Sequence, residues 1–178
     1  AMGLGRSLSL IGDTTSRVVV TDQQGYDWGR YYDEVLSPED PIQWIFFSKL
    51  TALERTDADQ VLFIDSDSLA FRKLGPIFDY CQGKGLAVQG EMCSDGDWYG
   101  DLRQHCERHG VPALPRINGG LIYYERSAQG FIETIRGYGE RAGDLGFARD
   151  DPLVPDEPCI ALAMAQTGQG HLIPEDMN

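Results

Sequence analysis

Three aspartate pairs of the form D-x-D are the first residues of this sequence that indicate a chemistry. They lie at 57/59, 65/67 and 95/97, and a chain with 18 aspartates would produce about two such pairs by chance. The pair Asp65 and Asp67 differs from the others because it ends the continuous apolar run of residues 60–65, which is typical of a strand covered on both faces. The position of this pair at the end of a predicted strand is therefore stronger evidence for a functional site than the D-x-D motif itself.

The spacing of Asp65 and Asp67 suits a divalent cation. At the end of a strand, residues i and i+2 project to the same side, so both carboxylates can reach one ion. Mg²⁺ or Mn²⁺ binds carboxylate and phosphate oxygens and keeps positions open for a substrate, which favours a carrier of diphosphate over a closed structural site. The alternative is a turn in which the two aspartates cap backbone amides.

Lys49 is a cation in an unusual place. On a helix predicted over residues 40–56, it lies four residues after Ile45 and four before Leu53, along the apolar stripe. We expect an anionic partner there, either a ligand phosphate or the acidic pair. The alternative is a side chain that extends along the rim into solvent.

Two further segments are candidates for ligand contacts. Asn118, Gly119 and Gly120 precede an apolar strand, where backbone can approach a ligand and the amide can bind a hydroxyl-rich group, although the same residues also form ordinary turns. Asp156 and Glu157 precede a predicted helix, which they could cap, or they could present a carboxylate to a sugar.

The hydrophobic pattern predicts the elements that position these residues. Helices are expected at 4–10, 40–56, 76–81, 101–109, 128–138 and 159–166, and strands at 17–22, 60–65, 85–89 and 120–124. The segments between 91 and 115, apart from one helix, and between 139 and 158 are expected to be loops. Alternating strands and helices indicate an α/β sheet protein, whose ligands usually lie at the carboxyl ends of the strands.

Composition limits the classes of function. A length of 178 residues predicts a single domain spanning 1–178, and the longest apolar runs are too short to cross a membrane. We see no secretory signal, so a cytoplasmic location is expected. The net charge of −13 makes nucleic acid an unsuitable partner, and a phosphorylated substrate would need a metal ion to offset repulsion.

Four cysteines occur without a C-x-x-C pair, which favours free buried thiols. Cys93, His105 and His109 are the only other grouping typical of a metal site, with the two histidines four residues apart on a predicted helix. Half of the usual zinc ligands are missing from this grouping. We therefore expect a solvent-facing helix there.

The order of these features resembles family 8 glycosyltransferases, the glycogenin-like and lipopolysaccharide galactosyltransferase group, over about residues 4–175. The resemblance rests on Lys49, on the strand ending in Asp65-Ser-Asp67, on Asn118-Gly-Gly, and on Pro155-Asp-Glu. It implies the nucleotide-diphospho-sugar transferase fold called GT-A, a Rossmann-like mixed sheet flanked by helices. It also implies a retaining hexosyltransferase with a nucleotide-sugar donor, a UDP-sugar being the first expectation.

The resemblance also implies residue roles. Asp65 and Asp67 would hold Mn²⁺ or Mg²⁺, and Asp156 and Glu157 would be catalytic residues beside the donor sugar. The donor would contact Lys49, Ser66, Asn118, Gly119 and Gly120. Two features depart from the family pattern: the usual first strand, which holds the nucleotide base, is missing, and His171 does not match the late histidine motif that supplies a third metal ligand.

Two other functions fit parts of the pattern. A glycosyltransferase-like domain that binds a partner without catalysis fits the missing segments. A phosphatase of the haloacid dehalogenase type also has an apolar strand ending in D-x-D, but its motif normally lies near the start of the chain, and Asp150 and Asp151 fall in a predicted loop. The acceptor, whether saccharide, lipid or protein, is not indicated by the sequence.

Overall fold

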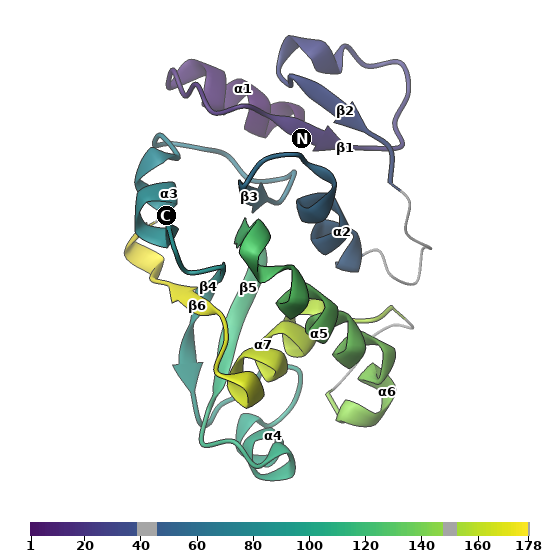
Figure 1. The fold of residues 1–178 in the computed structure, drawn as a ribbon, viewed down its shortest axis with the longest axis vertical. Coiled ribbons are helices and arrows are strands. Elements are labelled where there is room, and N and C mark those ends of the chain that lie inside the picture. The colour runs from purple at the N-terminus through teal and green to yellow at the C-terminus, as the bar shows by residue number, and fades with distance from the viewer. Residues whose placement is uncertain (39–45, 148–152, 178) are drawn as a thin grey trace.

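The main sheet of the protein has four strands. The computed structural model describes residues 1–38, 46–147 and 153–177. The strand order is β3-β5-β4-β6, with β3 at Gln60–Ile64, β4 at Leu86–Cys93, β5 at Leu114–Glu125 and β6 at His171–Ile173. Strand β5 runs antiparallel to β3 and β4, whereas β6 is parallel to β4. Two short strands, β1 (Val18–Val20) and β2 (Glu34–Leu36), pair in parallel in a separate sheet (Figure 1).

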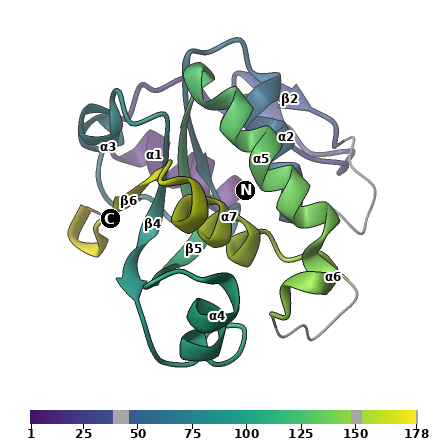
Figure 2. The ribbon, with the colours of Figure 1, turned by 60° about the horizontal axis from the view of Figure 1, so that its bottom comes forward.

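Helices cover both faces of the main sheet. They are α1 (Met2–Leu10), α2 (Ser48–Arg55), α3 (Gly75–Cys81), α4 (Leu102–His109), α5 (Gln129–Glu140), α6 (Ala142–Leu145) and α7 (Asp156–Thr167). Helices α5 and α7 pack side by side in front of the sheet, and α4 lies beyond the far end of β4 and β5 (Figure 2). The predicted α/β class is therefore confirmed as a mixed sheet flanked by helices.

Alternating side chains divide the core into two layers. In β3, Val61 and Phe63 pack into the larger core, to which α2, α5 and α7 also contribute. Leu62 and Ile64 point to the opposite face, where α1 and α3 cover the sheet. The backbone N–H of Asp65 still donates a hydrogen bond across to β5, so the extended strand geometry continues and the side chain of Asp65 belongs to the face of Val61 and Phe63.

Residues 119–121 form a bulge inside β5, so the alternative of an ordinary turn at residues 118–120 is wrong. Val88 of β4 pairs with Ile122, but the next residue, Gln89, pairs with Asn118. The three β5 residues between these partners have no counterpart on β4, so β5 bends away from β4 at this point. Glycine is suited to such a bulge because it allows close approach of other chain segments. The pairing partners lie about thirty residues away, and the local sequence shows only the turn-like composition.

The helix predicted over 40–56 is observed only in its second half. Helix α2 begins at Ser48, and residues 39–45 lie outside the described residues. The helix predicted at 101–109 is confirmed: the Asp101 carboxylate caps α4 by accepting hydrogen bonds from two backbone N–H groups in its first turn. Both β4 and β5 are longer than predicted, which shortens the connection expected between 91 and 115.

The loop expected at 139–158 contains helix α6 and the first turn of α7. Helix α7 begins at Asp156, three residues earlier than predicted, and Pro158 fits within its first turn. Asp150 and Asp151 lie outside the described residues. Strand β2 was not predicted at all, because its three residues carry only a short apolar pattern. Within the described ranges, no helix has the length and apolar character needed to cross a membrane.

Candidate functional site

A lysine and an aspartate from different helices meet beside the bulge of β5. The Lys49 Nζ atom of α2 lies 2.8 Å from the Asp156 Oδ2 atom of α7, and the two side chains are only 11% and 5% exposed. The same ammonium donates a hydrogen bond of 3.1 Å to the carbonyl oxygen of Gly119 and lies 5.6 Å from the ring centroid of Phe63. An anion meets Lys49, as predicted, but it is the Asp156 carboxylate and neither of the expected partners, the Asp65 and Asp67 pair or a ligand phosphate.

Gly119 is the backbone element around which these side chains gather. A Cβ atom at this position would lie 2.8 Å from Lys49 Nζ and 3.1 Å from Asp156 Oδ2, and it would also crowd Glu157. The absence of a side chain therefore lets three charged groups approach one stretch of main chain. Gly120 is similar, because a Cβ atom there would lie 3.1 Å from Asp65 Oδ2.

Glu157 is held at both of its carboxylate oxygens. Oε1 accepts a hydrogen bond of 2.8 Å from the backbone N–H of Gly119, and Oε2 accepts one of 3.2 Å from the hydroxyl of Tyr99. Burial raises the pKa of Glu157, the neighbouring charge of Asp156 raises it further, and the two hydrogen bonds and Lys49 oppose this rise. Neither acid caps α7, whose N-cap residue is Pro155 without a side-chain hydrogen bond, so the capping interpretation is wrong.

The acidic pair lies at the edge of this cluster. Asp65 is half-buried, whereas Ser66 and Asp67 are exposed. Burial raises the pKa of Asp65, Lys49 opposes the rise, and the charges of Asp67 and Asp156 add to it. Asp65 lies at Gly120, next to the Lys49 and Asp156 pair at Gly119, and the charge of Asp67 also acts on Asp65.

The carboxylates of Asp65 and Asp67 have unused acceptor capacity. Among the described residues, neither carboxylate forms a hydrogen bond or an ion pair, and the local turn is closed instead by the backbone N–H of Ser68 donating to the Asp65 carbonyl. The alternative in which the two aspartates cap backbone amides is thus wrong for their side chains. Ser66 contributes its carbonyl oxygen to a hydrogen bond with the amino group of Ala1.

Asn118 joins the site to a polar hollow. Its Oδ1 atom accepts a hydrogen bond of 2.8 Å from the N–H of Gly120, which leaves the amide NH₂ group facing outward on an exposed residue. The hollow has a volume of about 270 Å³. Its walls come from β4, β5 and the segments beside them, and they include Gln89, Glu91, Trp98, Arg116, Asn118 and Glu175. Amide, carboxylate and indole groups around such a space suit a hydroxyl-rich ligand.

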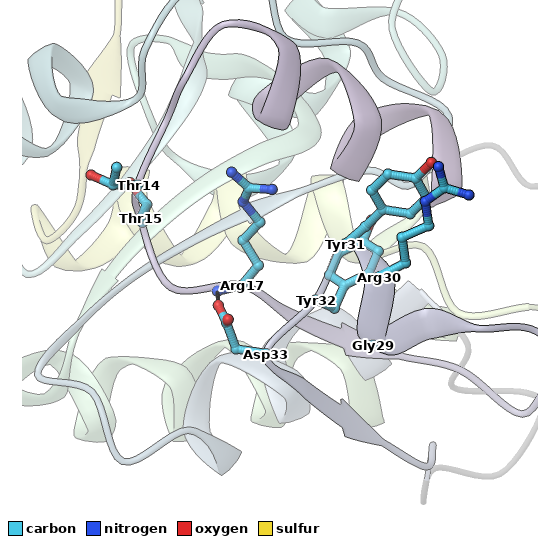
Figure 3. Close-up of a pocket in the computed structure, with 8 residues that line it drawn as sticks. All are labelled: Thr14, Thr15, Arg17, Gly29, Arg30, Tyr31, Tyr32 and Asp33. Atoms are coloured by element: carbon cyan, nitrogen blue, oxygen red, sulfur yellow. Dashed lines mark hydrogen bonds between the residues drawn. The ribbon is translucent and has the colours of Figure 1, made fainter.

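A second hollow, of about 250 Å³, lies between the segment that follows α1, the residue before β1 and the turn before β2 (Figure 3). The guanidinium of Arg17 extends from its wall toward α1, where it donates to the carbonyl oxygens of Gly5 and Asp13 and to the hydroxyl of Ser9. The backbone N–H of Arg17 donates to the Asp33 carboxylate. These hydrogen bonds hold α1 against the start of β1, and they give the Arg17 guanidinium partners within the protein.

The histidines of α4 serve packing. His105 is 6% exposed, its ring centroid lies 4.3 Å from that of Phe147, and the ring of His109 stacks on Phe147 at 5.7 Å. The expectation that this helix face meets solvent is wrong for His105, because Phe147, 42 residues later in the chain, covers it.

In the part of the chain that the structure describes, no three histidine, cysteine or acidic side chains are grouped for a metal. None of the four cysteines, all of which lie in the described part of the chain, forms a disulfide, and three of them are buried, as expected.

Sequence reasoning missed Tyr99 and Trp98. Tyr99 contacts Glu157, which lies 58 positions later in the chain, and no local sequence pattern predicts such a contact. The one available signal was the run Asp-Trp-Tyr-Gly, in which two aromatic residues stand in a polar segment.

Comparison of the chain with models of known protein families, with curated proteins and with solved structures found no match.

Proposed function

We propose that this protein is a metal-dependent glycosyltransferase, which moves a sugar from a nucleotide-diphosphate donor, first of all a UDP-sugar, to an acceptor. The observation that carries the proposal is the gathering of Lys49, Asp156 and the D-x-D pair around glycine backbone. A donor of this kind combines a diphosphate, which needs positive charge, with hydroxyl groups, which need fixed acceptors. The motif order that resembles family 8 glycosyltransferases, with its GT-A fold, supports the same assignment.

Asp65 and Asp67 fit the metal that the proposal requires. Their carboxylates are close enough for one charge to disfavour the other, and neither forms a hydrogen bond among the described residues. A cation would relieve this repulsion. Two carboxylates supply too few ligands for Mg²⁺ or Mn²⁺, so oxygens of the donor diphosphate would complete the coordination. When bound, the ion would stabilise the negative charge that develops on the departing nucleotide.

Lys49 would change partner when the donor binds. In the structure its ammonium is paired with Asp156. A donor phosphate competes for the same ammonium, and the Asp156 carboxylate is then available to accept a hydrogen bond from a sugar hydroxyl. Glu157 is fixed beside it by the Gly119 N–H. Ser66, Asn118, Gly119 and Gly120 would contact the donor, and the hollow beside Asn118 would take the sugar or the acceptor.

A non-catalytic binding domain is the second candidate function. The observation that favours it is that Lys49 already forms an ion pair with Asp156, while Lys49 and Glu157 both hydrogen-bond to the Gly119 main chain. Such internal pairing suits a domain that has kept the architecture of a donor site and lost its activity. The two candidates differ in whether a bound donor is cleaved.

Calorimetric titration of Mn²⁺ with and without UDP tests the metal site. We expect weak binding of Mn²⁺ alone and at least about tenfold tighter binding with UDP, because phosphate oxygens complete the coordination shell. Asp67→Asn should abolish this coupling and leave the fold intact. The matched control is Asp95→Asn in the exposed pair at 95/97, which should leave the coupling unchanged. Equal Mn²⁺ affinity with and without UDP, or an equal effect of the control, refutes the assignment.

A panel of nucleotide sugars then separates the two candidate functions. A donor at one hundred times its dissociation constant should stabilise the folded state by about 2.7 kcal/mol, which is measured as a rise in Tm in the presence of Mn²⁺. Release of UDP from that donor, lost in Asp67→Asn, supports a glycosyltransferase. Stabilisation without any UDP release over long incubation, across a panel of acceptors, supports the binding domain.

A further inference from the structure

Tyr99 has a backbone conformation that tyrosine rarely adopts. Its φ angle is 52°, and it is the only residue other than glycine with a positive φ among those described. A side chain on Cβ clashes with the following peptide in this region, so the conformation persists only where its surroundings enforce it. Residues held in this way are concentrated at functional sites.

The turn around Tyr99 is fastened on several sides. The N–H of Trp98 donates to the carbonyl of Gly100 at 2.8 Å, and the N–H of Leu102 donates to the carbonyl of Gly96 at 3.0 Å. His105 Nε2 lies 3.1 Å from the Tyr99 carbonyl oxygen. Because a carbonyl oxygen only accepts, Nε2 carries the hydrogen and donates it.

Gly100 allows the imidazole of His105 to come this close. Gly100 has a φ of 112°, and a Cβ atom at this position would lie 2.9 Å from His105 Nε2. His105 itself is buried against Phe147, so its ring has little freedom to move away. The histidine therefore closes the turn from the side of α4.

The result of this conformation is the contact between Tyr99 and Glu157. The Tyr99 hydroxyl donates to Oε2, while the Gly119 N–H donates to Oε1, so the carboxylate is held from two directions. The ring of Tyr99 also packs against the core, and a tyrosine that only packed would need no left-handed backbone. Removal of either donor would let the carboxylate rotate about its last bond.

We propose that Tyr99 is a positioning residue, whose hydroxyl, fixed by the left-handed turn that His105 closes, orients the Glu157 carboxylate. In this orientation Glu157 binds the main chain of Gly119, to which the Asp156 carboxylate also lies close. The inference about the turn stands on the ligand-free geometry. The identity of the group toward which Glu157 is directed, the donor sugar, rests on the proposed function.

The test uses the full chain with and without ligand. Tyr99→Phe keeps the ring and removes the donor, His105→Leu removes the donor that closes the turn, and His105→Gln keeps an N–H at nearly the same place. Tyr138→Phe is the matched control, because it removes a tyrosine hydroxyl that bonds Gln166 far from the site. The first readout is the titration of the Glu157 carboxyl carbon by NMR, without any nucleotide.

We expect the pKa of Glu157 to rise in Tyr99→Phe, because the charged form loses a hydrogen bond. Four other groups face this carboxylate: the Gly119 N–H of β5, Lys49 of α2, Asp156 of α7 and the helix N-terminus, and none is altered. The pKa should rise in His105→Leu as well, and it should stay near its starting value in His105→Gln and Tyr138→Phe. An unchanged Glu157 titration in both Tyr99→Phe and His105→Leu overturns the proposal.

The second readout compares UDP with a UDP-sugar, both with Mn²⁺. Tyr99→Phe should weaken the sugar-dependent part of the affinity by about tenfold and leave the affinity for UDP unchanged. If the titration of Glu157 shifts while the wild-type protein binds no nucleotide at all, the positioning role stands and the proposed function fails. If the wild-type protein binds the donor and neither readout responds to Tyr99→Phe, the positioning role fails alone.

Discussion

Replacing Lys49 with methionine tests the energetic argument most directly. The substitution keeps the length of an apolar stem along the α2 stripe but removes the ammonium, so Asp156 remains 5% exposed without its partner at 2.8 Å. Breaking a buried ion pair in this way costs about 3–5 kcal/mol, since the remaining charge is uncompensated. We expect the lower end, about 3 kcal/mol, because Lys49 keeps some solvent contact. With an m-value of about 2 kcal/mol/M, the urea midpoint should fall by about 1.5 M. Urea denaturation followed by circular dichroism measures this loss.

Two controls separate the charge from the packing. The double substitution Lys49→Met with Asp156→Leu removes both charges and should recover most of the loss. Arg116→Met breaks an ion pair whose side chains are 46% and 54% exposed, and it should cost about 1 kcal/mol or less. A loss of under about 1 kcal/mol in Lys49→Met would show that the Asp156 charge is not left buried and uncompensated, as the reasoning requires.

Two further predictions concern β5. Gly119→Ala should abolish UDP-sugar binding in calorimetry, because its Cβ would push apart Lys49, Asp156 and Glu157, whereas Gly137→Ala, on the open face of α5, should leave binding unchanged and raise stability by up to about 1 kcal/mol. Burial raises the pKa of Glu125, but hydrogen bonds from Tyr123, Gly83 and Gly85 lower it more, and the net shift is downward. The Glu125 carboxylate therefore stabilises the folded state above the ordinary glutamate pKa, and this stabilisation is lost as the pH falls through the lower pKa of the folded state. In Glu125→Gln, acid denaturation monitored by fluorescence should show a free energy of unfolding that depends less on pH.

The sequence predicted correctly the features that depend on residues close to one another in the chain. The apolar run of β3 is readable because both of its faces are buried, and its last residue places Asp65 at the strand end. Lys49 was recognised as unusual because helical periodicity alone puts it on the apolar stripe. The helix α4 and its Asp101 cap follow from composition within one turn. Each of these inferences depends on residues no more than a few positions apart.

Three of the errors involve partners that are distant in the sequence. The bulge at Gly119 exists because β5 changes its pairing with β4 there, and a glycine pair reads locally as a turn. His105 is buried because Phe147 packs on it, whereas the polar residues beside it in α4 predicted exposure to solvent. Tyr99 reaches Glu157 only through a positive φ angle, which no sequence pattern for tyrosine predicts.

The distribution of charge at the site argues that a cation precedes or accompanies any anionic ligand. The carboxylates of Asp65, Asp156 and Glu157 lie around the Lys49 ammonium, and Asp67 is close enough to Asp65 for its charge to act there. Lys49 compensates Asp156, and hydrogen bonds from Gly119 and Tyr99 hold Glu157. The charges left over are those of Asp65 and Asp67, in a chain whose net charge is −13. A free diphosphate would be repelled by this arrangement, and a divalent ion reverses the sign of the local field at the one place where acceptors are unused.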